Sequence, residues 1–310
     1  MPDELFTLAA ATSGAPASAP FGRVLTAMVT PFLDDGGLDV EGTAALAEKL
    51  VDDGCDGLVL SGTTGESPTT SDAEKDLILR TVLDAVGSRA KVIAGVGTND
   101  TRHTSELAQA AQKAGAHGLL VVTPYYSKPP QEALYQHFTA VASASDLPVM
   151  LYDIPARSGV AIETETLVRL AGHERIVAVK DAKGDVFASS EVMARTGLAY
   201  YSGDDALNLA LLAHGAVGVV SVVSHVAARE YAQMVRAVDS GDLRRALGLH
   251  RRLIPAVRGI MTRTQGAIMA KAAVQLLGVV QNRTVRSPLI PATDEQVALL
   301  RSDLAEAGLA

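Results

Sequence analysis

The chain has 310 residues, of which 48% are hydrophobic and 20% charged, so it can bury a large core as one α/β barrel or as two smaller domains. Its formal net charge is -8 and it has no long basic run, which argues against nucleic acid or an anionic membrane surface as its main partner. The single cysteine, Cys55, cannot form an internal disulfide, and no Cys/His cluster has the spacing of metal ligands.

The N-terminal region lacks the features of a signal peptide. It begins Met1-Pro2-Asp3-Glu4, which is acidic where a secretory signal would be basic, and it continues with Ala, Ser, Pro and Thr. No apolar run comes near the ~20 residues that a bilayer span needs. We therefore expect a flexible arm over residues 1–20 that carries no chemistry, and a cytoplasmic protein.

From residue 21 onward, short apolar runs alternate with longer amphipathic runs. The apolar runs, which predict strands, are Val24–Val29, Gly57–Ser61, Val92–Gly95, Gly118–Val122, Pro148–Tyr152, Ile176–Lys180, Leu198–Ser202 and Val217–Val222. The runs that predict helices are Val40–Asp53, Ser71–Val86, Thr101–Ala114, Gln131–Ala144, Glu163–Leu170, Val186–Arg195, Ala206–Ala213 and Ala227–Val238. About eight strand–helix units in tandem predict parallel strands, and their number favours an α/β fold of the (β/α)8 TIM-barrel type over a doubly wound sheet.

After Val238 the alternation stops and the pattern becomes purely helical. Helices are expected over Leu243–Gly259, Gly266–Leu277 and Thr293–Ala307. The predicted organisation is therefore a catalytic barrel over residues 21–238, followed by a C-terminal helical extension over residues 239–310.

Several predicted helices carry start and stop signals. Ser71–Glu74 has the pattern of a capping box, and Thr101, Glu163 and Asp205 are interpreted as cap or first-turn residues. Gly54, Gly87 and Gly115 follow predicted helix ends, where a left-handed C-cap is expected.

The stretch Ile176–Gly184 places a lysine at the end of a buried strand. Apolar residues run directly into Lys180, and a short polar turn follows. Burial there would lower the pKa of the amine from its usual ~10.4, and only the neutral amine attacks a carbonyl. Taken alone, the stretch favours the simpler interpretation, a lysine that marks the strand end and reaches solvent.

The predicted C-terminal strand ends meet on one face of the barrel, where barrel enzymes build their active sites. Together they supply one lysine, several hydroxyls and one arginine, without a carboxylate pair for glycosidic chemistry. This combination indicates imine chemistry on an acidic carbonyl substrate: the lysine is the nucleophile, phenol and threonine hydroxyls move protons, and the arginine holds a carboxylate.

Six segments in a fixed order carry a resemblance to a known family. They are GTTGES at Gly62–Ser67, TPYY at Thr123–Tyr126, YDIPARSG at Tyr152–Gly159, Val179–Lys180 with Gly184, GDD at Gly203–Asp205 and GVVS at Gly218–Ser221. From about Phe21 to Leu277 the chain resembles the dihydrodipicolinate synthase/N-acetylneuraminate lyase family of pyruvate-dependent class I aldolases. Each segment alone is weak evidence, but six in order at barrel strand ends are specific.

The resemblance implies four catalytic residues. Lys180 would form the Schiff base with pyruvate, and Tyr152 would be the general acid/base for imine formation. Thr63 and Tyr126 would complete a proton relay with Tyr152, with Tyr126 entering from a neighbouring subunit. The implied assembly is a homotetramer, a dimer of dimers, and no cofactor is implied because pyruvate supplies the carbonyl that becomes the electron sink.

The resemblance also implies substrate-binding residues. Thr64 would bond the pyruvate carboxylate, and the backbone at Gly203 and Val220 would line the pocket. Arg157 indicates the synthase branch, in which an arginine at this place binds the carboxylate of L-aspartate 4-semialdehyde, whereas the lyase branch typically has an apolar residue. The expected reaction condenses pyruvate with this semialdehyde in the diaminopimelate route to lysine.

The chain departs from lysine-inhibited members of the family at three positions. These members carry histidines in the helix after GTTGES and a glutamate after the Asn of the third strand's loop, where this chain has Asp72, Lys75 and His103. A charged Lys75 facing a lysine effector would oppose binding through like-charge repulsion. We therefore expect weak or absent feedback inhibition by lysine.

Two alternatives stay open at this point. One is another aldolase of the family that acts on a sugar-derived 2-oxo acid, against which Arg157 argues. The other is a non-catalytic 2-oxo-acid sensor, which would not need the proton relay of Tyr152, Thr63 and Tyr126.

Overall fold

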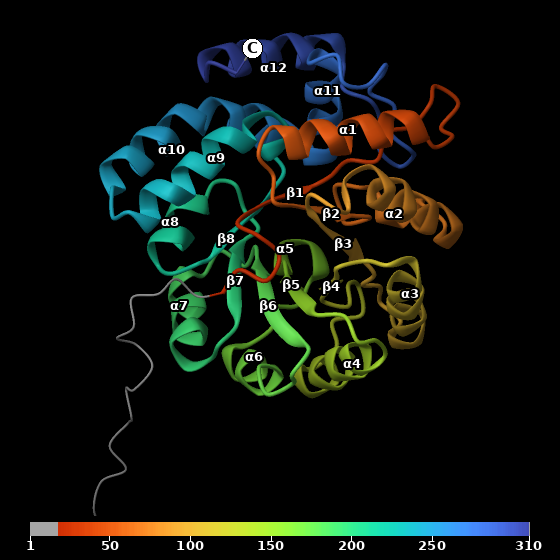
Figure 1. Ribbon diagram of the computed structural model, residues 1–310, viewed down its shortest axis with the longest axis vertical. Coiled ribbons are helices and arrows are strands. Elements are labelled where there is room, and N and C mark those ends of the chain that lie inside the picture. The colour runs from red at the N-terminus through yellow and green to blue at the C-terminus, as the bar shows by residue number, and fades with distance from the viewer. Residues whose placement is uncertain (1–17, 310) are drawn as a thin grey trace, which may run out of the picture.

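Eight parallel strands close into one barrel, in chain order, in the computed structural model, which describes residues 18–309 (Figure 1). The strands are β1 (Val24–Ala27), β2 (Gly57–Leu60), β3 (Lys91–Gly95), β4 (Gly118–Val122), β5 (Val149–Asp153), β6 (Ile176–Asp181), β7 (Ala199–Ser202) and β8 (Gly218–Ser221). Because β8 pairs with β1, the ring has no free edge. The predicted (β/α)8 barrel is confirmed. The predicted arm lies outside the described residues except for residues 18–20.

Helices surround the barrel and connect its strands (Figure 1). They are α1 (Val40–Asp52), α2 (Asp72–Val86), α3 (Thr101–Ala114), α4 (Gln131–Ser143), α6 (Thr164–Leu170), α7 (Val186–Arg195), α8 (Asn208–Ala213) and α9 (Ser224–Asp239). Two short helices that the pattern did not predict follow strand ends: the 3₁₀ helix η1 (Ser67–Thr69) after β2 and α5 (Pro155–Ser158) after β5. Within residues 18–309, no helix combines the length and apolarity that crossing a membrane requires.

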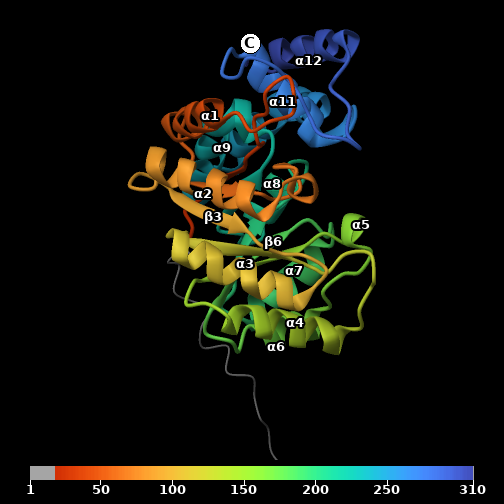
Figure 2. The same cartoon turned by 90° about the vertical axis from the view of Figure 1, so that its right-hand side faces the viewer.

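The chain ends in a helical extension that packs on one side of the barrel. It consists of α10 (Leu243–Val257), a π-helical turn η2 (Arg258–Thr262), α11 (Gly266–Leu276) and α12 (Asp294–Glu306). α10 packs against α9, and α12 packs against both α10 and α11. Figures 1 and 2 both place α11 and α12 beyond α1, on the side of the barrel opposite α4 and α6.

One phenylalanine fills the N-terminal end of the barrel. Phe21 is fully buried, and its backbone N–H donates to the hydroxyl of Tyr201 at 3.3 Å. β4 begins with Gly118, where an added Cβ would lie 2.4 Å from the Phe21 ring. Only glycine leaves room for the ring, so this end of the barrel is closed by packing and the site must lie at the other end.

Two of the predicted helix signals, at Gly87 and Asp205, were wrong. Thr101 is the first residue of α3, and Asp100 caps this helix, because its carboxylate accepts from the N–H groups of Arg102 and His103. Gly87 follows α2 in a right-handed conformation, whereas Gly54 and Gly115 have the predicted positive φ. Asp205 caps no helix and takes part in the buried network described below. A carboxylate in a turn can bond either the next helix or a neighbouring strand end, and local sequence does not separate the two.

Candidate active site

Lys180 and Tyr152 lie side by side at the C-terminal ends of two adjacent strands. Their Cα atoms are paired across β5 and β6, and the Lys180 Nζ lies 4.1 Å from the centroid of the Tyr152 ring. Both residues are 5% exposed. A Cβ at Gly203, just after β7, would lie 2.8 Å from the Lys180 Cγ, so a side chain there would displace the lysine. Lys180 near the end of β6 and Gly203 just after β7 lie at neighbouring strand ends, as the sequence predicted.

Burial sets the protonation of this pair. It lowers the pKa of Lys180 to about 7, with the charge of Asp205 acting in the opposite direction and that of Arg157 adding to the decrease. Burial also raises the pKa of Tyr152 to about 12, against the effects of Arg157 and of a hydrogen bond from Thr63. Near neutral pH a large share of Lys180 is therefore the neutral amine, whereas Tyr152 keeps its proton. The pair can act as nucleophile and proton donor.

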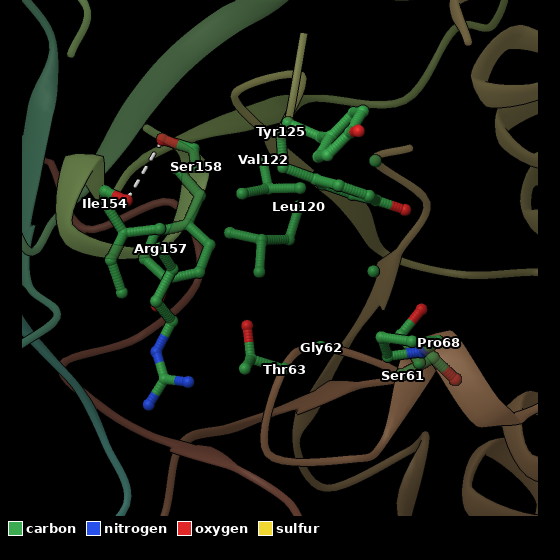
Figure 3. Close-up of a pocket in the computed structure, with 15 residues that line it drawn as sticks. Ser61, Gly62, Thr63, Pro68, Leu120, Val122, Tyr125, Ile154, Arg157 and Ser158 are labelled. Atoms are coloured by element: carbon green, nitrogen blue, oxygen red, sulfur yellow. Dashed lines mark hydrogen bonds between the residues drawn. The ribbon is translucent and has the colours of Figure 1, made fainter. Parts of the chain in front are cut away.

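A cavity of about 340 Å³ opens beside the pair at this end of the barrel (Figure 3). Thr63, Tyr126, Tyr152 and Arg157 all line it. In Figure 3 the side chains of Thr63, from the loop after β2, and Arg157, from α5, extend into the same space. The volume suits a small carbonyl compound, at the lower end of the range of ligand pockets.

Thr64, Gly203 and Val220 do not line this cavity within the described chain. Thr64 is buried beside Thr63, and Val220 lies in β8, where it pairs with Leu25 of β1. Thr63, Tyr126, Tyr152 and Arg157 therefore border one cavity, with Lys180 beside Tyr152 but not among the residues that line the cavity.

Tyr126 projects from the rim of the cavity into solvent. It is 90% exposed, and its backbone has a positive φ of 76°, which is uncommon for a residue with a side chain. Its N–H donates to the carbonyl of Ser158 at 3.3 Å, which ties the TPYY turn to the end of α5. The phenol ring of Tyr126 is therefore held at the rim with almost all of its surface open to solvent.

Asp153 supports the segment that carries Arg157, a function that the sequence reasoning missed. It follows Tyr152 and points to the opposite side of β5, where its carboxylate accepts from the N–H of Ile162 at 3.2 Å and lies 3.4 Å from the Lys183 Nζ. Lys183 also donates to the carbonyl of Ile162 at 3.0 Å. Burial raises the pKa of Asp153 to about 6, against the charge of Lys183. The alternation of side chains along a strand could have predicted that Asp153 points out of the barrel. It could not have predicted the hydrogen bond to Ile162, nine residues further along the chain.

A second buried carboxylate, Asp205, lies between the ends of β7 and β8. It accepts from the N–H groups of Val222 and Val223 at 2.9 and 3.1 Å, from the amide of Asn208 and from the hydroxyl of Ser221. These donors fix the Asp205 carboxylate near Lys180, where its negative charge raises the pKa of the lysine. Lys180 therefore has a pKa between that of a solvated lysine and that of a lysine in a purely apolar site.

Within residues 18–309, no group of three or more His, Cys, Asp or Glu side chains is arranged to hold a metal ion. Cys55 is buried, and burial raises the pKa of its thiol to about 12, so it is a packed residue as expected.

A closed (β/α)8 barrel with a buried, partly neutral lysine and a neighbouring tyrosine at its C-terminal end defines a class of enzymes that activate carbonyl compounds as imines. Residues 20–307 match the model of the dihydrodipicolinate synthetase family, and the chain belongs to this family.

Relatives of known name agree with this assignment. The chain is 71% identical over 291 residues to 4-hydroxy-tetrahydrodipicolinate synthase of Kineococcus radiotolerans, covering 94% of both chains. It is 67% identical to the enzyme of the same name from Acidothermus cellulolyticus, again with 94% of both chains covered.

Solved structures give the same result. Dihydrodipicolinate synthase DapA-2 of Bacillus anthracis matches with a TM-score of 0.89 and 42% identity, covering 92% of this chain and 98% of that one. The lysine-bound enzyme of Cyanidioschyzon merolae matches with a TM-score of 0.91 and 40% identity, covering 94% and 99%.

Proposed function

We propose that the chain catalyses the 4-hydroxy-tetrahydrodipicolinate synthase reaction, the condensation of pyruvate with L-aspartate 4-semialdehyde in the diaminopimelate route to lysine. The observation that carries this proposal is the buried Lys180 beside Tyr152, with Arg157 lining the adjoining cavity. The names of the family and of its relatives, 53% to 71% identical, support the same reaction.

The first half of the reaction forms an enamine on Lys180. The neutral Nζ attacks C2 of pyruvate, the carbinolamine loses water, and the resulting iminium loses a proton from C3. Tyr152, which stays protonated, donates the proton that lets water leave, and Thr63 relays protons to and from it. Thr64 bonds the pyruvate carboxylate. The backbone of Gly203, next to Lys180, and that of Val220 in β8 line the pyruvate end of the site, outside the cavity that Arg157 lines.

The second half joins the two substrates. C3 of the enamine attacks the aldehyde carbon of the semialdehyde, whose carboxylate Arg157 holds through its planar pair of donors. The amine of the new product then attacks the imine carbon, which closes the ring and releases Lys180 as a free amine. Atoms balance without an oxidant or a reductant.

Borohydride trapping and an assay with two aldehydes test the function. Reduction in the presence of pyruvate should attach a pyruvyl group to the peptide that contains Lys180, and turnover should require L-aspartate 4-semialdehyde. Turnover only with a sugar aldehyde would indicate the other kind of aldolase, and pyruvate binding without trapping or turnover would indicate a sensor.

The pKa of Lys180 predicts the pH dependence of imine formation. Because the protonated amine cannot attack, the rate constant for trapping at low pyruvate should rise with pH and level off above an inflection near pH 7. A solvated lysine would place that inflection near ~10.4. Single-turnover trapping between pH 5.5 and 9.5 measures it, and an inflection above pH 9 would contradict the buried amine.

We propose a homotetramer built as a dimer of dimers, in which Tyr126 enters the cavity of a neighbouring subunit. Its 90% exposure at the rim supports a second chain there. One solved relative, 38% identical, is described as a monomeric dihydrodipicolinate synthase variant, so assembly has to be measured. Sedimentation equilibrium gives the number of chains, and a monomer with full activity would contradict the role of Tyr126.

We further propose weak or absent feedback inhibition by lysine. Asp72 and Lys75 line a second cavity between α2 and α3, and Asp72 is bound to His103 at 2.9 Å. Lys75 donates to the carbonyl of Thr70, which fixes a cationic group in the wall. We expect the initial rate to stay unchanged up to about 1 mM lysine, because the positive charge of Lys75 repels the effector. Strong inhibition at sub-millimolar lysine would contradict this proposal.

We propose a cytoplasmic location, which the biosynthetic names of the relatives support. We also propose residues 21–238 as the catalytic unit and residues 239–310 as its extension.

A further inference from the structure

A buried ion cluster connects the C-terminal extension to the turn that follows Thr63 and Thr64. Glu66 is 2% exposed, and its Oε1 lies 2.5 Å from the Nζ of Lys271 in α11, which is also 2% exposed. The Lys271 ammonium donates to the carbonyl of Thr284 at 2.7 Å, and the backbone N–H of Arg286 donates to the Glu66 Oε2 at 2.9 Å. We call Glu66, Lys271 and Arg286 the anchor cluster.

The side chain of Arg286 binds two further segments near the catalytic turn. It donates to the carbonyls of Gly36 and Thr69 and forms a two-pronged ion pair with Glu74, at the first turn of α2. Both cations make cation–π contacts with the ring of Phe32, with the Lys271 Nζ 3.9 Å and the Arg286 Cζ 4.2 Å from the ring centroid. The extension thus binds the loops after β1 and β2 at several points.

The backbone at Glu66 shows why the turn needs this support. Glu66 has a φ of 53°, a left-handed conformation that a residue with a side chain keeps only when its surroundings hold it. Its N–H donates to the carbonyl of Thr63 at 3.3 Å, and the N–H of Ser67 donates to the carbonyl of Gly62 at 3.1 Å. A shift at Glu66 is therefore passed directly to the two threonines.

Stability alone gives a weak reason for the anchor cluster. Burial lowers the pKa of Lys271 to about 8, against the charge of Glu66, so the ammonium is held in an unfavourable environment. Buried ion pairs are often no more stable than apolar residues of the same volume. A charge pair between a strained catalytic turn and a distant helix instead fixes one geometry, because its energy depends steeply on distance.

We propose that the anchor cluster is a positioning device for Thr63 and Thr64, through which the C-terminal extension sets the geometry of the catalytic loop. Glu66, Lys271 and Arg286 are positioning residues and touch no substrate. This inference rests on the roles proposed above for the two threonines.

The test compares the same chemical change at two buried carboxylates. E66Q removes the charge within the anchor cluster, and E66Q/K271M removes both charges so that neither is left unpaired. D303N is the matched control: Asp303 is 2% exposed and binds Arg258 and Arg263, which both lie in the extension. Each variant is examined as the full chain for its melting temperature, its kcat, its KM for pyruvate and its rate of borohydride trapping.

Both Glu66 variants should fold, raise the KM for pyruvate about tenfold and slow trapping on Lys180, since displacements of about 1 Å cost up to ~10²-fold in rate. D303N should lower the melting temperature while its kcat and KM stay within about twofold of wild type, because its partners do not reach the loop. E66Q/K271M with wild-type kinetics, or D303N with the same kinetic loss, would overturn the inference. If the wild-type chain itself fails to trap pyruvate, the proposed function fails as well; if it traps normally, only the positioning role is at issue.

Discussion

Replacing Lys180 with methionine is expected to abolish turnover, with kcat reduced by at least ~10⁴-fold, because the covalent route needs an amine at this position. Methionine keeps the length of the side chain and fits the space that Gly203 leaves beside it. Steady-state assays and mass mapping after borohydride reduction with pyruvate measure the effect. K113M, at an exposed lysine in α3, is the control and should be trapped like wild type.

The stability of K180M separates loss of the nucleophile from loss of the fold. The pKa of Lys180 is about 7 in the folded state and near its usual ~10.4 in the unfolded state, so the unfolded chain binds more protons between these values. Wild-type stability therefore falls as the pH drops from about 10 to about 7, and K180M escapes this loss. Its melting temperature at pH 7 should equal or exceed that of wild type. If K180M is inactive and its melting temperature lies far below that of wild type, the loss of activity reflects loss of the fold and does not support Lys180 as the nucleophile.

Replacing Arg157 with methionine should reduce kcat/KM for L-aspartate 4-semialdehyde by about 10²-fold, the scale of a charge-assisted, two-pronged hydrogen bond. The trapping of Lys180 at high pH, where its amine is fully neutral, should change little, because Arg157 meets only the second substrate in the proposed mechanism. R157K should recover only part of the loss, since an ammonium lacks the planar fork.

The same substitution has a second readout. The charge of Arg157 lowers the pKa of Lys180, so R157M should move the inflection for imine formation to higher pH, whereas R157K should not. If R157M reduced kcat/KM equally for pyruvate and for L-aspartate 4-semialdehyde, and left the inflection unchanged, carboxylate binding by Arg157 would be contradicted.

Much of this arrangement could be predicted from sequence because it depends on local periodicity. The strand that ends at Lys180 and the strand that ends at Tyr152 are both apolar runs bounded by turns, and parallel order around a barrel makes them neighbours. Burial at the strand end then lowers the pKa of Lys180, as expected.

Other parts depend on contacts between distant segments, which periodicity does not encode. Asp205 has the sequence signature of a helix cap and instead binds the start of α9, and Asp153 supports the loop of Arg157 from outside the barrel. The short helix α5 was missed because four residues cannot show a helical period. The exposure of Tyr126 depends on how the rim of the cavity folds, so local sequence patterns do not predict it.

The bond between Glu66 and Arg286 spans 220 residues, and this separation orders events during synthesis. Chains grow from the N-terminus, so the GTTGES turn and all eight strands leave the ribosome before α11 and the segment of Arg286 exist. A nascent chain that has only closed its ring holds Lys180 and both threonines but not the anchor of their turn. In the inferred scheme, the catalytic turn is therefore anchored only after Arg286, in the last quarter of the chain, has been made.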